Sequence, residues 1–428
     1  MESFLTVLPL VAILVLLLPP FRFHILGAGL VGGVLAALIG GLDIAQITKL
    51  FLGGLSRMMG ITSVAIFAAT AMTLAKLGAP QACLKLVQRV FKGRLAPVAA
   101  AMVLVQAAAV YVAGCGAANP LVTAPLISSM VGFVPHVVAG LSIVSGATWA
   151  TSPASAESAY LSEAMGITPT EYAAFMRPFT FTFWIIGALL AWYGVWRYAK
   201  AGKLKPATTD ESAESGQGAL GEDEPLGAVV RRAFPFLLFL SLILIGPPIN
   251  RAVGTSLFTT VTTPLLVLIT AAITARVKAN KVAEMLVDGS TTILRYLFLV
   301  GLFLGFINLL GEIGTFETLA GLAGAVPPSL VVLAALIIAF LIAIPSAAYT
   351  VAIDALIIPV LAAVGVPVWA FGFVGIAVAQ GAMISPVQIN VAATAHGFRT
   401  DIMRVITNNL PYMPAALLVT LLMVTLFV

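Results

Sequence analysis

The sequence carries little charge for its length. Only 9% of its 428 residues are charged, whereas a soluble globular chain carries roughly 25%. Hydrophobic residues make up 61% of the chain, which is more than a core surrounded by water can hold. A bilayer accommodates them, because about 20 apolar residues span its hydrocarbon. We therefore expect a multi-pass protein of the cell inner membrane, in contact with the lipid bilayer and with no nucleic-acid partner.

Residues that build metal centres or catalytic sites are also scarce. The two cysteines, Cys83 and Cys115, have no paired spacing, which excludes a disulfide framework and a Cys-based metal site. The sequence contains no phosphate-loop lysine motif, no HExxH and no GxSxG. A GxGxxG match at 27–32 lies inside an apolar run, so it predicts close helix packing rather than dinucleotide binding. We expect no enzyme, no cofactor, and no metal other than Na⁺ as a coupling ion.

The apolar residues fall into segments that predict an all-α membrane protein in two halves. A polar stretch at 201–227 contains Ser, Gly and Ala with several acidic residues, which is typical of a solvated linker. We therefore divide the chain into a first repeat at 1–200, a cytoplasmic linker at 201–231 and a second repeat at 232–428.

The two halves repeat each other. Pro125 and Pro359 lie 234 positions apart, and Pro153 and Pro386 lie 233 apart. A near-constant offset indicates an internal duplication. Each half then consists of three helices, a re-entrant helical hairpin, a broken transmembrane helix and a final helix.

The distribution of positive charge predicts that the repeats are inverted. With the N-terminus outside, all of the 22 Lys and Arg residues fall on the cytoplasmic side except Lys49, Arg57, Arg177 and Arg251. This asymmetry follows the positive-inside rule. It places both termini and a loop at 43–49 outside and the linker inside. Inverted repeats with broken helices are typical of secondary transporters.

The hairpin turns are the first candidate binding elements. Gly116 and Asn119 lie where Gly and a pre-Pro residue stop the first hairpin helix, and Ser346 and Thr350 flank the second turn. Irregular backbone at membrane depth is tolerated only where it lines protein or water. The alternative is a pair of ordinary kinked helices in which small residues allow close packing.

The broken helices are the second pair of candidate binding elements. Pro153 and Pro386 each remove a backbone donor and free upstream carbonyl groups. These carbonyls, together with nearby hydroxyls, would form an oxygen shell for a small cation. The half-helix N-terminus that follows would favour an anion. Ser and Thr in membrane helices can instead bond to their own backbone.

Glu157 and Asp354 are ionisable residues in otherwise apolar segments, and such residues are usually functional. Glu157 could alternatively lie at the outer interface. Neither hairpin and neither broken helix contains Arg or Lys, so amides, hydroxyls, dipoles and co-bound cations would hold an anionic substrate. The candidate substrate-binding residues are Gly116, Asn119, Thr151, Ser152, Ser346, Thr350 and Ser385. The candidates for cation or proton coupling are Asn119, Thr148, Ser346, Asp354, Glu157 and Asn390.

This layout resembles the ion transporter superfamily, which includes divalent-anion/sodium symporters and C4-dicarboxylate and gluconate carriers. The Ser-Pro pairs at 152–153 and 385–386 are similar to those of the C4-dicarboxylate and gluconate carriers. Of the Ser-Asn-Thr triplets at the hairpin tips of the sodium/dicarboxylate branch, this sequence matches only Asn119 and Ser346. The resemblance implies that the hairpins and broken helices move as an elevator against a scaffold.

These observations predict a secondary active transporter for the Na⁺- or H⁺-coupled uptake of a small organic anion, such as a C4-dicarboxylate. We expect a homodimer. Two alternatives remain open. One is a cation/proton antiporter or oxyanion exporter on the same fold, and the other is the membrane subunit of a transporter that depends on a soluble binding protein.

Overall fold

The computed structural model describes residues 5–17, 21, 23–59, 62–91, 94–114, 120–204, 224–255, 257–259, 261–323, 327–347, 350–386 and 388–427. Within these ranges every regular element is a helix, as the sequence predicts. The helices of the first half are α2 (Leu8–Leu17), α3 (Ile25–Gly40), α4 (Ile44–Met59), α5 (Thr62–Lys76), α6 (Ala79–Val90), α7 (Leu95–Ala113), α8 (Pro120–Val131), α9 (Pro135–Thr151), α10 (Ala156–Met165) and α11 (Pro169–Lys200).

The second half differs from the first, since four described helices and not five precede its predicted hairpin. Its helices are α13 (Leu226–Val253), α14 (Thr262–Ala275), α15 (Ala279–Glu312), α16 (Thr315–Ala323), α17 (Pro328–Ser346), α18 (Thr350–Ala363), the short 3₁₀ helix η2 (Val368–Ala370), α19 (Phe371–Ala382), α20 (Ile389–Gly397), α21 (Ile402–Asn409) and α22 (Tyr412–Phe427). The pairs α7–α8 and α17–α18 occupy the positions of the predicted hairpins.

Four described helices are long and apolar enough to cross a membrane. They are Leu95–Ala113, Pro169–Lys200, Leu226–Gly246 and Ala279–Glu312. The pair α21–α22 bends by 43° and would form one further span. Helix α15 has 34 residues, or about 51 Å at 1.5 Å per residue, which exceeds the roughly 30 Å of bilayer hydrocarbon. This composition and length are those of a multi-pass membrane protein.

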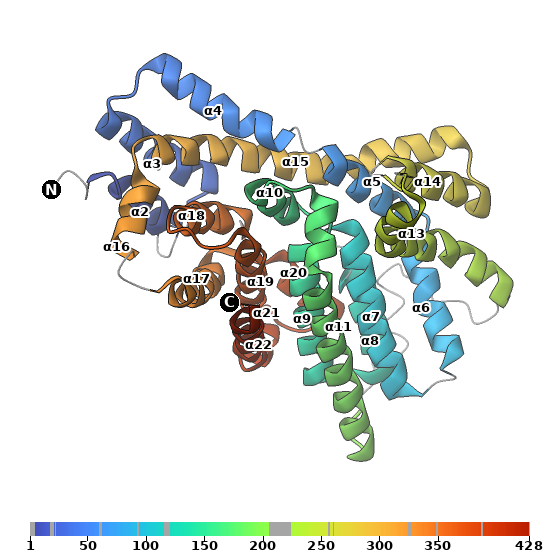
Figure 1. The fold of residues 1–428 in the computed structure, drawn as a ribbon. Coiled ribbons are helices and arrows are strands. Elements are labelled where there is room, and N and C mark those ends of the chain that lie inside the picture. The colour runs from blue at the N-terminus through green and yellow to red at the C-terminus, as the bar shows by residue number, and fades with distance from the viewer. Residues whose placement is uncertain are drawn as a thin grey trace.

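The helices form two groups around α15 (Figure 1). In the first group, α15 packs along α3, α4 and α5, which belong to the other half of the chain. In the second, α7, α9 and α11 pack side by side, and α19 joins them to α17 and α22. The two hairpin pairs and both interrupted helices therefore belong to the second group, whereas α15 belongs to the first.

Contacts within that second group come in matching pairs. Helix α7 packs on α9, and α17 packs on α19. Helix α10 packs on α18 of the other half, and α20 packs on α8 of the other half. The helices α9 and α19 cross where Gly146 approaches α19, since a Cβ atom at that position would lie 3.2 Å from the Ala379 carbonyl oxygen. Each interrupted helix thus contacts the hairpin pair of both halves.

The glycines at 27–32 pack helices together, as the sequence predicts. A Cβ atom on Gly29 would lie 2.7 Å from a ring carbon of Phe306, and one on Gly32 would lie 2.4 Å from Ile13 Cγ1. These glycines therefore allow α3 to lie close to α15 on one side and to α2 on the other. The interpretation of this motif as helix packing is confirmed.

Two predicted element boundaries are wrong. The stretch at 43–49 is not a loop, because α4 begins at Ile44. Gln46 N–H donates to Asp43 Oδ1 at 2.7 Å and the Gln46 side chain accepts from Asp43 N–H at 3.0 Å, which caps this helix. The residues at 226–231 are likewise helical, because α13 begins within the predicted linker.

Glu224 joins the end of the linker to α6. Its carboxylate pairs with Lys85 at 3.0 Å and with Arg232, and Arg89 donates to its carbonyl oxygen at 2.6 Å. Burial, together with the positive charges of Arg232 and Arg89, lowers the pKa of Lys85 below its ordinary value. The two halves of the chain are therefore connected on the face of α6.

The predicted topology can be tested by cysteine labelling. In a protein with Cys83 and Cys115 replaced by Ser, we expect Ala45→Cys to react with a membrane-impermeant maleimide in intact cells. Ser215→Cys, in the linker, should react only after the membrane is permeabilised, because positive charge holds its flanks inside. Labelling of Ser215→Cys in intact cells would show that the predicted orientation is wrong.

Candidate functional site

The chain leaves the helical conformation at the first predicted break. Helix α9 ends at Thr151 and α10 begins at Ala156, because Pro153 lacks the N–H that would continue the helix. Ser155 caps α10 by accepting from Ser158 N–H at 3.0 Å. The second interruption lies between Ala382 and Ile389. Both Ser-Pro pairs thus lie between two helices.

Glu157 connects the two halves of the protein. It is 8% exposed, which places it inside the protein rather than at an outer interface. The hydroxyl of Thr350 donates to Glu157 Oε1 at 2.7 Å, and Trp149 also hydrogen-bonds to this carboxylate. Glu157 lies in the first turn of α10, and Thr350 is the first residue of α18. Two helix N-termini therefore favour a negative charge at this point.

Asp354 lies one helical turn beyond Thr350 on the same face of α18. Its side chain is completely buried, and neither carboxylate oxygen has a hydrogen-bond partner in the described part of the chain. A Cβ atom on Gly375 would lie 3.9 Å from Asp354 Oδ2 and 2.6 Å from Leu161 Cδ1. Asp354 therefore lies between α18, α10 and α19, close enough to Glu157 for their charges to interact.

An unpaired carboxylate in this position is unstable by itself. Transferring an isolated charge into a region of low dielectric costs many kcal/mol, and no described cationic group pairs with Asp354. The two carboxylates also repel each other when both are charged. A proton or a small cation at Asp354 would remove this cost, so the pair has the chemistry of a cation-coupling site.

Asn390 occupies in α20 the position that Glu157 occupies in α10, 233 residues earlier. It is buried, and its Oδ1 atom has no hydrogen-bond partner within the described ranges. The two interrupted helices thus carry a buried oxygen acceptor at equivalent positions, but only α10 carries a charge. The two positions therefore differ in charge.

The predicted hydroxyls of the first interrupted helix are already engaged within the protein. Thr148 Oγ1 accepts from Trp184 Nε1 at 2.6 Å. Thr151 donates to the Ala147 carbonyl oxygen at 2.8 Å and lies 2.7 Å from the hydroxyl of Thr180. Thr148 and Thr151 therefore face α11, and the alternative that such hydroxyls bond to nearby backbone applies to Thr151.

Ser152 is placed differently. Its hydroxyl donates to the Tyr111 carbonyl oxygen in α7 at 2.7 Å and accepts from Ala154 N–H at 3.0 Å. The carbonyl oxygen of Ala150, which the break frees, accepts from the hydroxyl of Tyr172 at 3.1 Å. The protein itself thus satisfies the oxygen atoms that we expected to surround a cation at this break.

Some of the remaining predicted site residues lie outside the part of the chain that the structure describes. Gly116 and Asn119 lie in the undescribed range 115–119. Ser346 is the last residue of α17, and its side chain is not among those described. Ser385 is completely buried in the second interruption. Of all the predicted residues, the structure brings together Glu157, Thr350 and Asp354.

Sequence reasoning missed Asn409. This buried residue donates to the Met383 carbonyl oxygen at 3.0 Å and to the Ser142 hydroxyl at 2.9 Å. It therefore satisfies a carbonyl group in the second interruption and connects it to α9. Asn409 is the last residue of α21 and lies two positions before Pro411, where α21 and α22 meet at a bend of 43°. Pro411 is a local signal for this break, but the prediction considered only the breaks at Pro153 and Pro386.

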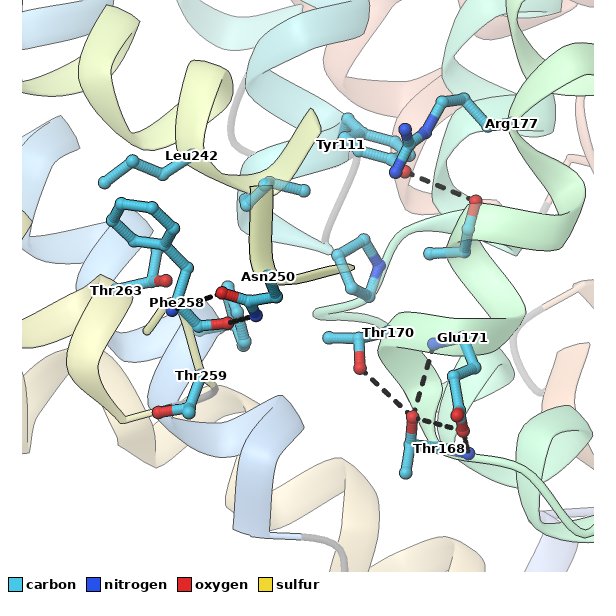
Figure 2. A pocket seen from close by; sticks show the side chains of 14 residues that line it. Tyr111, Thr168, Thr170, Glu171, Arg177, Leu242, Asn250, Phe258, Thr259 and Thr263 are labelled. Carbon is cyan, nitrogen blue, oxygen red and sulfur yellow. Dashed lines mark hydrogen bonds between the residues drawn. The ribbon is translucent and has the colours of Figure 1, made fainter. Parts of the chain in front are cut away.

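The structure also contains a cavity of about 350 Å³ that no sequence pattern indicates (Figure 2). Tyr111, Thr168, Thr170, Glu171 and Arg177 lie on one side of it. Leu242, Asn250, Phe258, Thr259 and Thr263, from α13, α14 and the turn between them, lie on the other. Pro153 also lines the cavity, which therefore extends to the first interrupted helix.

Comparison with known proteins identifies the fold. No family model matches the chain, and no curated protein matches it. Among solved structures, the chain is similar to the crystal structure of the Alcanivorax borkumensis YdaH transporter, with a TM-score of 0.58 and 18% sequence identity. The match covers 99% of this chain and 98% of that chain. The two proteins share an all-helical, multi-pass membrane fold over their whole length.

Proposed function

We propose that this protein is a secondary transporter that couples a small cation to the movement of a small organic anion such as a C4-dicarboxylate. The observation that carries this proposal is the buried Asp354 carboxylate beside Glu157. Its charge needs a proton or Na⁺, and a site that requires an exchangeable cation can couple cation binding to another event. The fold is that of a structure described as a transporter, which supports the same class.

The proposal includes two inverted repeats and an elevator movement in the inner membrane. The constant sequence offset and the matching contacts of α10 with α18 and of α20 with α8 support the repeats. Both hairpin pairs and both interrupted helices belong to one group of helices, while α15 packs with α3, α4 and α5. The hairpin pairs and interrupted helices would form the moving domain, and α15 with α3, α4 and α5 would form the scaffold, in a homodimer.

A cation/proton antiporter on the same fold is the second candidate. The two carboxylates at Glu157 and Asp354 favour it, because a buried acidic pair can exchange a proton for a metal cation without an organic substrate. The two candidates differ in one respect: a symporter moves the cation and the anion together, whereas an antiporter moves two cations in opposite directions.

The test is the uptake of labelled carboxylates by proteoliposomes under separate Na⁺ and H⁺ gradients. We expect the apparent affinity for a C4-dicarboxylate to rise about 5- to 150-fold with one of the two cations, because coupling between sites is reciprocal and typically of that size. Empty liposomes provide the background. Affinity that stays flat against both cations would contradict the proposal, and proton-driven Na⁺ flux without any carboxylate would support the antiporter.

A further inference from the structure

The cavity beside Pro153 contains a cationic group that no part of the coupling site uses. Arg177 lies in α11 and donates from Nη1 to the Leu244 carbonyl oxygen of α13 at 2.8 Å. Its Nε atom is buried and has no partner in the described part of the chain. A guanidinium group has five N–H donors and remains charged at every physiological pH. Arg177 therefore has donors available for a further acceptor.

The charge of Arg177 has no counterion among the described residues. Glu171 is a carboxylate that lines the same cavity, but no ion pair joins it to Arg177 in the described residues. The two residues are six positions apart in α11, or about 9 Å along the helix axis. Glu171 is instead bound to Thr168, whose N–H and hydroxyl donate to its Oε2 at 2.8 Å each.

The rest of the lining suits a small molecule that has both polar and apolar parts. Hydroxyls come from Thr168, Thr170 and Thr259, and apolar surface comes from Phe67 and Leu242. A volume of about 350 Å³ lies in the range of small-ligand pockets, which combine apolar walls with a few polar groups. Figure 2 shows Arg177 and Tyr111 on one wall of the cavity, opposite Leu242.

The cavity extends to the first interrupted helix. The turn that precedes α11 and the turn between α13 and α14 border it, and the predicted topology would place both turns outside the cell. Pro153, in the first interruption, also lines it. The cavity is therefore lined both by Arg177 and by the break that precedes α10, the helix that carries Glu157.

We propose that this cavity is an outer binding site for a small soluble carboxylate, with Arg177 as the group that binds the carboxylate. Guanidinium groups bind carboxylates through two parallel N–H···O bonds, which are about twice as strong as neutral hydrogen bonds. That the bound carboxylate is also the transported anion rests on the proposed function. The binding of a carboxylate at Arg177 does not. The site provides the positive charge that the hairpins and interrupted helices lack.

The experiment measures binding by the purified full-length protein in phospholipid-free detergent. Acetate, succinate and gluconate are titrated at constant ionic strength while thermal unfolding is recorded, since a ligand that binds the folded state raises the unfolding temperature. We expect saturable stabilisation by at least one of them. The concentration for half-maximal stabilisation should rise about 10- to 100-fold in Arg177→Gln, because a hydrogen bond to a charged group contributes roughly 1.5–3 kcal/mol.

Two variants and one chemical measurement complete the test. Arg177→Lys, which keeps the charge but not the planar fork, should give an intermediate shift, and Lys49→Gln, which removes an exposed charge elsewhere, should behave as wild type. In wild-type protein, the same carboxylate should protect Arg177 from phenylglyoxal, as measured by peptide mass spectrometry. That readout needs no variant to fold.

Three outcomes would overturn the inference. They are no stabilisation by any of the three probes, equal binding by wild type and Arg177→Gln, and stabilisation that depends on Arg177 but occurs only with added phosphatidylglycerol. The last would assign the site to a lipid headgroup. Because the assay measures binding alone, absence of transport in wild-type proteoliposomes would contradict the proposed function and leave this result interpretable.

Discussion

Replacing Asp354 with Asn is expected to abolish cation-dependent accumulation of the substrate. The substitution keeps the shape of a completely buried side chain but removes the charge that needs a proton or Na⁺. Substrate affinity, which should vary about 5- to 150-fold with the coupling cation in the wild type, should become nearly independent of it. The measurement is substrate affinity against Na⁺ concentration and against pH in proteoliposomes, together with the steady-state accumulation ratio.

Asp288→Asn is the matched control. It makes the same chemical change at an acidic residue whose side chain is 69% exposed and pairs with Lys76 on the surface. Surface pairs of this kind contribute little, so coupling should be unchanged. If Asp354→Asn keeps the full cation dependence of the wild type, Asp354 is not the coupling residue and another group must hold the cation.

The second large effect is expected for Gly114→Ala. Gly114 ends α7 with a φ of 65°, a conformation that disfavours side chains. A Cβ atom there would lie 2.0 Å from the carbonyl oxygen of Ala154 in the first interruption. The methyl group would force the end of α7 away from Ala154, and we expect transport to fall by more than tenfold.

Gly166→Ala is a control that separates the effect of backbone strain from the effect of the contact with Ala154. Gly166 has a φ of 70°, but a Cβ atom there meets no other atom within 4 Å. The Gly166→Ala variant should lose only about 1–2 kcal/mol of folding free energy, because the left-handed backbone disfavours a side chain. It should keep the transport rate of the wild type. Uptake per folded protein and thermal stability are measured for both variants. Equal loss of transport in the two would show that backbone strain, and not the contact with Ala154, is responsible.

The sequence predicts the positions of the helix breaks but not the direction of the side chains beside them. Pro153 and Pro386 determine where each helix stops, since proline cannot continue the hydrogen bonding of a helix. Thr148 and Thr151 lie next to the first break, yet their hydroxyls face α11. Which face of a buried helix meets which neighbour depends on packing, and an apolar helix without a polar face gives no pattern to reveal it.

The composition and order of the sequence by themselves indicated the class of this protein: a helical chain in a bilayer, two halves with a near-constant offset, and two acidic residues, Glu157 and Asp354, in otherwise apolar segments. These features follow from local properties such as hydropathy, proline and charge. Only the tertiary structure decided that Thr350, 193 positions away, donates to Glu157, and that Arg177 lies in a cavity that reaches Pro153. Contacts between distant segments are fixed by the packing of whole helices, and no residue carries that information alone.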